Sequence, residues 1–366
     1  MTEQRTLESG KAWLLDRLER GAHPLDGVDP HEARVTIEEL EGLDPKSWTT
    51  AWGSAAERFA AEAKSATDRQ AERAARWQAY RFAFLARYPV PNHRLKREAY
   101  ARSRELFLEA ARLDDPPVEV YSVPFRGRAG EGDSVRFYLA RPRAAERPPV
   151  VMAWAGIDTW KEEAYSRLAN YRQQHVATLL VDMPGVGESP VLAGRDAERQ
   201  WDPVFDWLAS RDDLDAARCV ALGMSFGGYW AMKLGYTHAD RLRGVVNWGG
   251  GVHVTFTPEW QARSRNASSY LIDLMAARAG IFGGSTFEDY VARCQELSLL
   301  DLGLLDQPSA PMLLVNGKND VQNSIDDIYL SLEHGRPKSA RVFPGGHMGE
   351  GPVAQVIETW LLERLR

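Results

Sequence analysis

The sequence has few cysteines, no long apolar run and no excess of positive charge. Only Cys219 and Cys294 occur among 366 residues, which excludes a disulfide framework, and no Cys/His cluster has the spacing of metal ligands. No apolar stretch reaches the roughly 18 residues that a membrane span needs. A net charge of −6 lacks the basic footprint of a nucleic-acid binder, and the charged N-terminus lacks a signal peptide's apolar core. We expect a cytoplasmic protein without nucleic-acid or membrane partners.

The chain changes character near residue 115. Residues 1–115 are rich in alanine, arginine and glutamate, with helical periodicity and little strand signal, which predicts an N-terminal helical cap domain. Ser47 and Thr67 are predicted to cap two of its helices. The runs of arginine and glutamate are interpreted as solvated helix faces rather than a binding patch.

A strand pattern follows from residue 118 onward. Two alternating segments, 118–125 and 134–142, flank a glycine-rich turn and predict an antiparallel pair. Short apolar runs then alternate with helical stretches, which is typical of buried parallel strands with crossover helices. These runs are 148–156, 176–183, 218–224, 242–250, 311–317 and a weaker one at 339–346. The fold class is therefore α/β, with a mostly parallel central sheet spanning residues 116–366.

The interval of residues 251–304 is longer than a crossover between two neighbouring strands requires. It predicts a helical insertion in the α/β domain. Together with the N-terminal helices, the insertion is expected to form a lid over the site.

The segment 223–228, Gly-Met-Ser-Phe-Gly-Gly, stands directly between an apolar strand and a helical stretch. Glycines two residues on either side of Ser225 permit the tight strand-to-helix turn that exposes a nucleophilic serine in the α/β-hydrolase fold. The same turn brings the Phe226 N–H to a helix N-terminus, where it can bind an oxyanion. A glycine-rich turn without chemistry is the alternative interpretation.

A serine nucleophile needs a base, which in this fold follows it in the chain. His347 lies in a glycine-rich loop after the last strand and before the final helix, which is where this fold presents its base. His253 and His334 are the other histidines considered. His334 is expected to be exposed, and His253 to line the pocket or to be structural.

The third member of a triad is an acid that orients the histidine. Asp320 is the first carboxylate after the run 311–317 and is predicted to fill this role. Asp326 and Asp327 are the alternatives, although both are expected on the following helix.

The loop after the run 148–156 is predicted to supply the second oxyanion donor. Gly156 permits a close backbone approach, and the Ile157 N–H is the expected donor. The loop 182–189 contains Gly-x-Gly but not a dinucleotide fingerprint, so we interpret it as a structural turn and expect no cofactor. Three charged residues are interpreted as ion pairs that brace the first loop: Asp158, Lys161 and Glu162.

Taken together, the segments 155–163, 182–189 and 223–228 resemble the fermentation-respiration-switch type of α/β-hydrolase. That group includes 2,6-dihydroxypseudooxynicotine hydrolase and the fungal yellowish-green pigment hydrolases. The resemblance extends from about residue 70 to the C-terminus. It implies a helical domain closing over Ser225, the triad named above, and cleavage of carbon–carbon bonds beside a carbonyl in some members. Glu259 is its nearest candidate for an additional functional glutamate in the insertion.

Three hypotheses on function follow. The first is hydrolysis of a carbon–carbon bond beside a ketone in an aromatic or polyketide-like small molecule, because seven of the twelve tryptophans fall between residues 154 and 260. Core packing is the plainer explanation of those tryptophans. The second is a carboxylesterase or lactonase with the same triad, and the third a binding protein that has lost catalysis. Predicted substrate contacts are Gly156, Trp160, His253 and Glu259, and a homodimer is left open.

Overall fold

The computed structural model describes residues 5–265 and 271–366, and its contacts divide the chain into two units. The helical unit comprises the described part of Met1–Val118 and Ser268–Ala277. The α/β unit comprises the described part of Glu119–Ala267 and Arg278–Arg366. Residues 271–277 therefore group with the helical unit although they belong to the predicted insertion.

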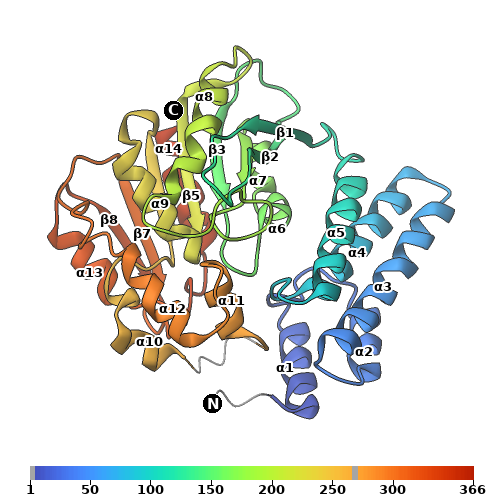
Figure 1. The fold of residues 1–366 in the computed structure, drawn as a ribbon. Coiled ribbons are helices and arrows are strands. Elements are labelled where there is room, and N and C mark those ends of the chain that lie inside the picture. The colour runs from blue at the N-terminus through green and yellow to red at the C-terminus, as the bar shows by residue number, and fades with distance from the viewer. Residues whose placement is uncertain (1–4, 266–270) are drawn as a thin grey trace. The chain divides into compact units, whose positions relative to one another are not determined.

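Three of the five N-terminal helices of the helical unit (Figure 1) have an aspartate as N-cap. Asp44 accepts hydrogen bonds from two backbone N–H groups at the start of α3, and Asp68 does the same for α4. The predicted caps, Ser47 and Thr67, are therefore wrong. The N-cap is the residue immediately before the first helical residue, and aspartates occupy that position in both helices. The helices are α1 (Leu7–Glu19), α2 (Pro30–Glu39), α3 (Pro45–Ser65), α4 (Arg69–Arg87) and α5 (Arg94–Ala111).

The core of the helical unit is aromatic. Trp48 and Trp52, one turn apart on α3, are fully buried, and Trp52 contacts Phe82 of α4 with ring centroids 6.0 Å apart. The Trp48 indole N–H donates to the carbonyl oxygen of Leu85 at 2.7 Å, so its one polar atom is satisfied inside the core.

Eight strands of the described chain form one sheet in the α/β unit, in the order β1-β2-β4-β3-β5-β6-β7-β8. The pairs β1–β2 and β2–β4 are antiparallel, and the remaining pairs are parallel. The predicted antiparallel pair and all six apolar runs are thereby confirmed. The strands are β1 (Glu119–Pro124), β2 (Ser134–Ala140), β3 (Pro149–Trp154), β4 (Ala177–Val181), β5 (Asp215–Met224), β6 (Gly244–Trp248), β7 (Met312–Gly317) and β8 (Ser339–Phe343).

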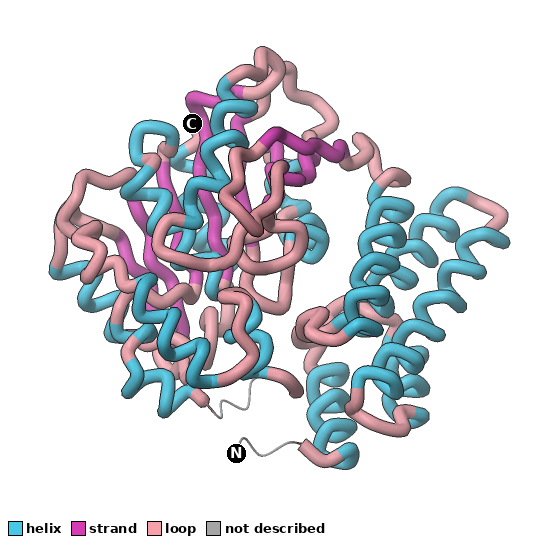
Figure 2. The backbone as a smooth tube through the Cα atoms, viewed as in Figure 1, coloured by secondary structure: helices cyan, strands magenta, loops and turns pink. Residues whose placement is uncertain are grey.

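Crossover helices cover both faces of this sheet (Figures 1 and 2). One face carries α8 (Asp202–Ala209) and α9 (Phe226–Thr237), and the other carries α6 (Lys161–Arg167), α7 (Ala169–Gln173) and α14 (Val353–Arg364). The predicted insertion contains α10 (Pro258–Ser264), α11 (Leu274–Gly280) and α12 (Phe287–Cys294), and α13 (Asp326–Glu333) joins β7 to β8. The predicted α/β-hydrolase architecture is confirmed, whereas the lid stays a prediction.

Candidate active site

Ser225 occupies the turn between β5 and α9 in a backbone conformation that non-glycine residues rarely adopt, with φ 55° and ψ −130°. The flanking glycines make this turn sterically feasible. A Cβ on Gly223 would lie 2.0 Å from the carbonyl oxygen of Gly227, and a Cβ on Gly227 would lie 2.2 Å from that of Ala155. The Ser225 N–H donates to the carbonyl oxygen of Trp248 at 2.7 Å. The predicted tight turn is confirmed.

His347 lies in the loop between β8 and α14, and its ring joins the serine to an acid. Its Nε2 atom is 2.8 Å from Ser225 Oγ, and its Nδ1 atom is 2.7 Å from Asp320 Oδ2. Asp320 follows β7, so three side chains distant in sequence lie in one hydrogen-bonded line. With the carboxylate ionised, Nδ1 carries the proton and donates to Asp320, which leaves Nε2 free to accept the serine proton.

Asp320 is buried but well supplied with donors. Asn316 Nδ2 donates to Oδ2 at 2.8 Å and the Gln322 N–H donates to Oδ1 at 2.7 Å. Burial alone would raise the pKa of Asp320. The adjacent His347, through its charge and its hydrogen bond, and the donors from Asn316 and Gln322 outweigh that effect and hold the pKa below its usual value. The acid is therefore ionised at neutral pH.

Asn316, at the end of β7, also holds the histidine loop. Its Oδ1 atom accepts from the Met348 N–H at 3.0 Å, next to His347 in the chain. At the next peptide group, Trp248 Nε1 donates to the Met348 carbonyl oxygen at 2.7 Å. Sequence reasoning missed both residues, because a single asparagine or tryptophan at a strand end carries no pattern that distinguishes it.

The loop after β3 packs directly against the serine. A Cβ on Gly156 would lie 2.8 Å from Ser225 Cβ and 3.5 Å from the Phe226 nitrogen, so only glycine permits this approach. Phe226 is the first residue of α9, and its N–H therefore has no acceptor within the helix. The Ile157 carbonyl oxygen accepts from Trp160 Nε1 at 2.8 Å, which ties the loop to the start of α6. The oxyanion roles of Ile157 and Phe226 stay predictions.

The remaining predicted residues differ in their exposure to solvent and in their hydrogen-bond partners. Trp160 is 2% exposed, and its indole N–H is engaged by Ile157 as described. His253 is partly exposed, with Nδ1 2.7 Å from Ser298 Oγ, whereas Glu259 is exposed on α10. His334 lies beside Asp306. The predicted substrate contacts of Gly156, Trp160, His253 and Glu259 stay predictions.

Asp327, an alternative for the triad acid, has a different set of partners. Its buried carboxylate accepts hydrogen bonds from four consecutive backbone N–H groups after β6, at 2.9, 2.9, 2.7 and 3.1 Å. The donors are Val252, His253, Val254 and Thr255. Asp326, the other alternative, is exposed at the start of α13.

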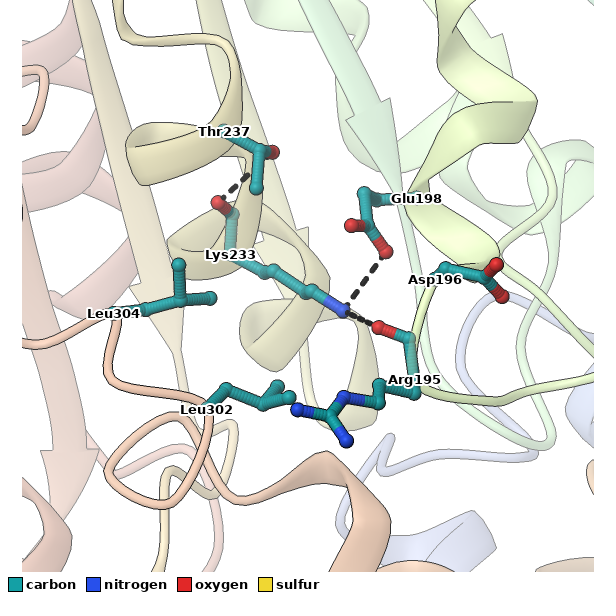
Figure 3. A pocket seen from close by; sticks show the side chains of 7 residues that line it. All are labelled: Arg195, Asp196, Glu198, Lys233, Thr237, Leu302 and Leu304. Carbon is teal, nitrogen blue, oxygen red and sulfur yellow. Dashed lines mark hydrogen bonds and ion pairs between the residues drawn. The ribbon is translucent and has the colours of Figure 1, made fainter.

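A surface hollow of about 420 Å³ lies at the other end of α9 (Figure 3). Lys233 in its wall is buried, lies 2.8 Å from Glu198 and donates to the carbonyl oxygen of Arg195. No residue that lines this hollow belongs to the Ser225–His347–Asp320 line. Among residues 5–265 and 271–366, no group of three or more His, Cys, Asp or Glu side chains is placed to hold a metal ion. No helix in that part of the chain has the length and apolarity of a membrane span.

Comparisons with known proteins identify the family and the fold. Residues 36–340 match the family model described as Esterase FrsA-like. Esterase FrsA of Citrobacter koseri is 28% identical over 80% of this chain and 74% of its own length. The crystal structure of 2,6-dihydroxy-pseudo-oxynicotine hydrolase is 21% identical, covering 97% of this chain and 95% of that one with a TM-score of 0.75. AbyA5 is 24% identical, covering 99% and 94%, with a TM-score of 0.73.

The two solved structures share the fold across almost the whole of this chain, including its helical N-terminal part. The family match covers most of the chain and confirms the resemblance seen in the segments 155–163, 182–189 and 223–228. The protein is an enzyme of the serine α/β-hydrolase type and belongs to the FrsA-like esterase family.

Proposed function

We propose that the protein hydrolyses an acyl substrate through a covalent intermediate on Ser225. The observation that carries this proposal is the continuous hydrogen-bonded line from Ser225 Oγ through His347 to Asp320. His347 removes the hydroxyl proton as the oxygen attacks the carbonyl carbon, and Asp320 stabilises the imidazolium that forms. The Ile157 and Phe226 N–H groups bind the oxyanion.

Collapse of the tetrahedral intermediate expels the leaving group, which takes the proton from His347. Water, deprotonated by the same histidine, then attacks the acyl-enzyme and releases the acid together with free Ser225. Carboxylic esters are the substrate class best supported for this chemistry, because the matching family and the curated relatives are named esterases.

Hydrolysis of a carbon–carbon bond beside a ketone is the second candidate. The likeness of the fold to 2,6-dihydroxy-pseudo-oxynicotine hydrolase over 97% of the chain supports it, as do the rings of Phe226, Tyr229 and Phe256, which contact one another at the start of α9. A carbon leaving group must be resonance-stabilised before His347 can protonate it, because a simple carbanion is too basic. Aryl ketones and 1,3-diketones meet that requirement.

The test is to incubate the purified chain with aryl acetates and with aromatic 1,3-diketones and to follow both products. Ester turnover without diketone cleavage excludes the second candidate, and the reverse outcome makes it the primary reaction. Ser225→Ala is the control for both, and labelling by a fluorophosphonate probe reports the nucleophile independently of substrate. Equal labelling of wild type and Ser225→Ala would refute the proposed nucleophile.

A further inference from the structure

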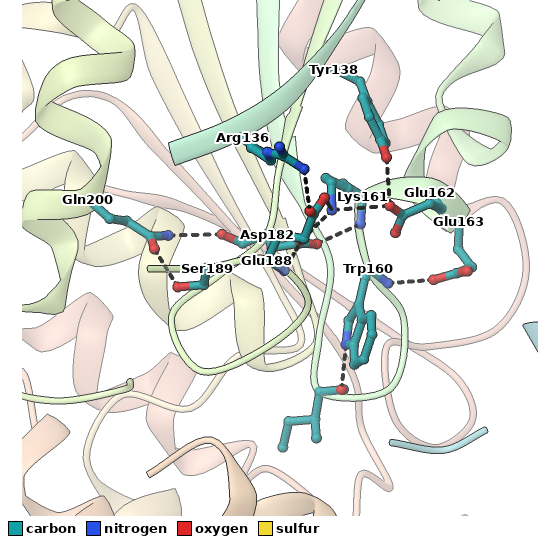
Figure 4. Close-up of polar contacts among 11 residues, drawn as sticks. Arg136, Tyr138, Trp160, Lys161, Glu162, Glu163, Asp182, Glu188, Ser189 and Gln200 are labelled. Atoms are coloured by element: carbon teal, nitrogen blue, oxygen red, sulfur yellow. Dashed lines mark hydrogen bonds and ion pairs between the residues drawn. The ribbon is translucent and has the colours of Figure 1, made fainter. Parts of the chain in front are cut away.

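A buried lysine with three carboxylates lies at the start of α6 (Figure 4). Lys161 is 0% exposed, and its ammonium nitrogen is 2.6 Å from Asp182 and 3.1 Å from both Glu162 and Glu188. A buried ammonium is costly without compensation, so at least one of these carboxylates must be ionised.

The hydrogen bonds of Asp182 are those expected of an ionised carboxylate. Oδ1 accepts from the Lys161 backbone N–H at 3.0 Å, while Oδ2 accepts from the Lys161 ammonium and from the Glu188 N–H at 2.8 Å. Gly187 is required for this close approach, since a Cβ there would lie 2.1 Å from Asp182 Oδ2. Asp182 therefore fastens the first residue of α6 to the end of β4 and to the loop 182–189.

Glu162 is surrounded differently. Its Oε1 atom accepts from the Tyr138 hydroxyl at 2.9 Å and faces the Lys161 ammonium, but Oε2 is buried without a hydrogen-bond partner among the residues that the structure describes. An ionised carboxylate with one buried, unpaired oxygen is unfavourable, whereas a protonated carboxyl group places less charge there.

The charges around Glu162 also favour its neutral, protonated form. Arg136 on β2 lies 3.1 Å from Glu188, so in the ion pairs of the described residues two cations, Lys161 and Arg136, face three carboxylates, Asp182, Glu188 and Glu162. Glu163, next along α6, adds a further negative charge and accepts from the Trp160 N–H at 2.7 Å. Burial and the nearby Asp182 raise the pKa of Glu162 to about 7, although Lys161 opposes them.

This cluster lies four residues beyond the predicted oxyanion donor. Trp160, the residue before Lys161, donates its indole N–H to the Ile157 carbonyl oxygen at 2.8 Å, so the loop and the cluster share one short connection. We propose that Asp182 is a positioning residue for the loop that binds the oxyanion, and that Glu162 is held as a neutral carboxylic acid whose ionisation disturbs that loop. The proposal rests on the function proposed above.

The test is the pH dependence of kcat and KM for hydrolysis of an aryl acetate by the full chain, from about pH 5 to about pH 9. Wild-type kcat is expected to fall on the alkaline side as Glu162 ionises. Glu162→Gln cannot ionise and is expected to lose this fall. Glu188→Gln, which changes a carboxylate at the same 3.1 Å from Lys161, is the matched control: it is expected to keep the alkaline fall, displaced to lower pH because the remaining charges then favour ionised Glu162.

Asp182→Asn is expected to lower kcat by about 10- to 100-fold at every pH, with KM changed by less than about twofold. A displaced loop weakens binding of the oxyanion in the transition state but not binding of the substrate. An alkaline fall that survives in Glu162→Gln, or a wild-type kcat in Asp182→Asn, would overturn the proposal. Circular dichroism of each variant separates misfolding from a misplaced loop.

A second measurement does not depend on activity. The pKa of Glu162 is raised from 4.5 to about 7 in the folded chain. As the pH rises between these values, the free energy of unfolding of the wild type therefore decreases, because Glu162 ionises more readily in the unfolded chain. The Tm of Glu162→Gln relative to wild type should therefore increase with pH over this range and then level. If Ser225→Ala hydrolyses the ester as fast as wild type, the proposed function fails, and this Tm difference alone decides whether Glu162 is neutral. A constant difference would refute its neutrality.

Discussion

Replacing Asp327 by asparagine tests whether one buried carboxylate organises the backbone after β6. Oδ1 accepts from His253 and Val254, and Oδ2 accepts from Val252 and Thr255. An amide retains only one of these oxygens, so in either orientation two backbone N–H groups face an NH₂ group. Each unsatisfied buried donor costs about 1–3 kcal/mol, which gives a loss of about 2–6 kcal/mol for Asp327→Asn.

The assay is urea unfolding of the full chain, followed by tryptophan fluorescence, which reports on both units, with the variants compared against wild type. Asp326→Asn is the matched control, because it makes the same chemical change on the adjacent, exposed residue and is expected to alter stability by less than about 0.5 kcal/mol. Equal midpoints and slopes for the two variants would refute the reasoning. They would mean that the four hydrogen bonds contribute no more than a solvent-exposed carboxylate.

Asn316→Ala is expected to lower kcat by about 10-fold with little change in KM, because Asp320 and the Met348 N–H each lose a partner worth about 1 kcal/mol; steady-state kinetics check this. Asp273→Asn removes the carboxylate that lies 3.1 Å from the buried Lys96 ammonium in the helical unit. Because Asp273 is partly exposed, we expect a loss of about 1–3 kcal/mol by chemical unfolding, and equal stability would contradict this. Gly227→Ala is expected to abolish hydrolysis through its clash with Ala155. Gly53→Ala should raise the free energy of unfolding by about 0.5–1 kcal/mol, because outside its own helix backbone and chain neighbours the described residues place no atom within 4 Å of the new Cβ.

The sequence allowed the triad to be predicted because each member follows a recognisable local signal. Ser225 lies between an apolar strand and a helix with glycines at the required spacing, and His347 and Asp320 follow the last two strands. The parallel strands β3, β4, β6 and β7 were predictable for a related reason: each is buried and largely apolar over five or six residues, without the period of an amphipathic helix. The helix caps were less predictable, because serine, threonine and aspartate all accept the same hydrogen bonds and only the backbone decides which residue precedes the first turn.

Buried polar contacts between residues distant in the chain were not predictable. Asp327 binds a segment more than seventy residues earlier, and Lys96 meets Asp273 across an interval of 177 residues. Neither pair has a motif. Lys161, Glu162 and Asp158 were interpreted as ion pairs that brace the loop. Lys161 does form a buried ion pair, but with Asp182 at 2.6 Å, whereas Glu162, 3.1 Å away, is the carboxyl group proposed above to be neutral. The sequence did not indicate that Glu162 Oε2 would be buried without a hydrogen-bond partner among the described residues.

Asp320 and Asp327 show why residue type alone does not assign a role. Both are buried aspartates after β7, and either is a chemically adequate partner for a histidine. Each oxygen of Asp327 accepts hydrogen bonds from two backbone N–H groups, so the carboxylate has no lone pair left for a histidine ring nitrogen. Asp320 receives one backbone N–H on Oδ1 and keeps Oδ2 for Asn316 and His347. Since a carboxylate accepts only a few hydrogen bonds, the number of backbone donors that surround it determines whether it can serve a catalytic base.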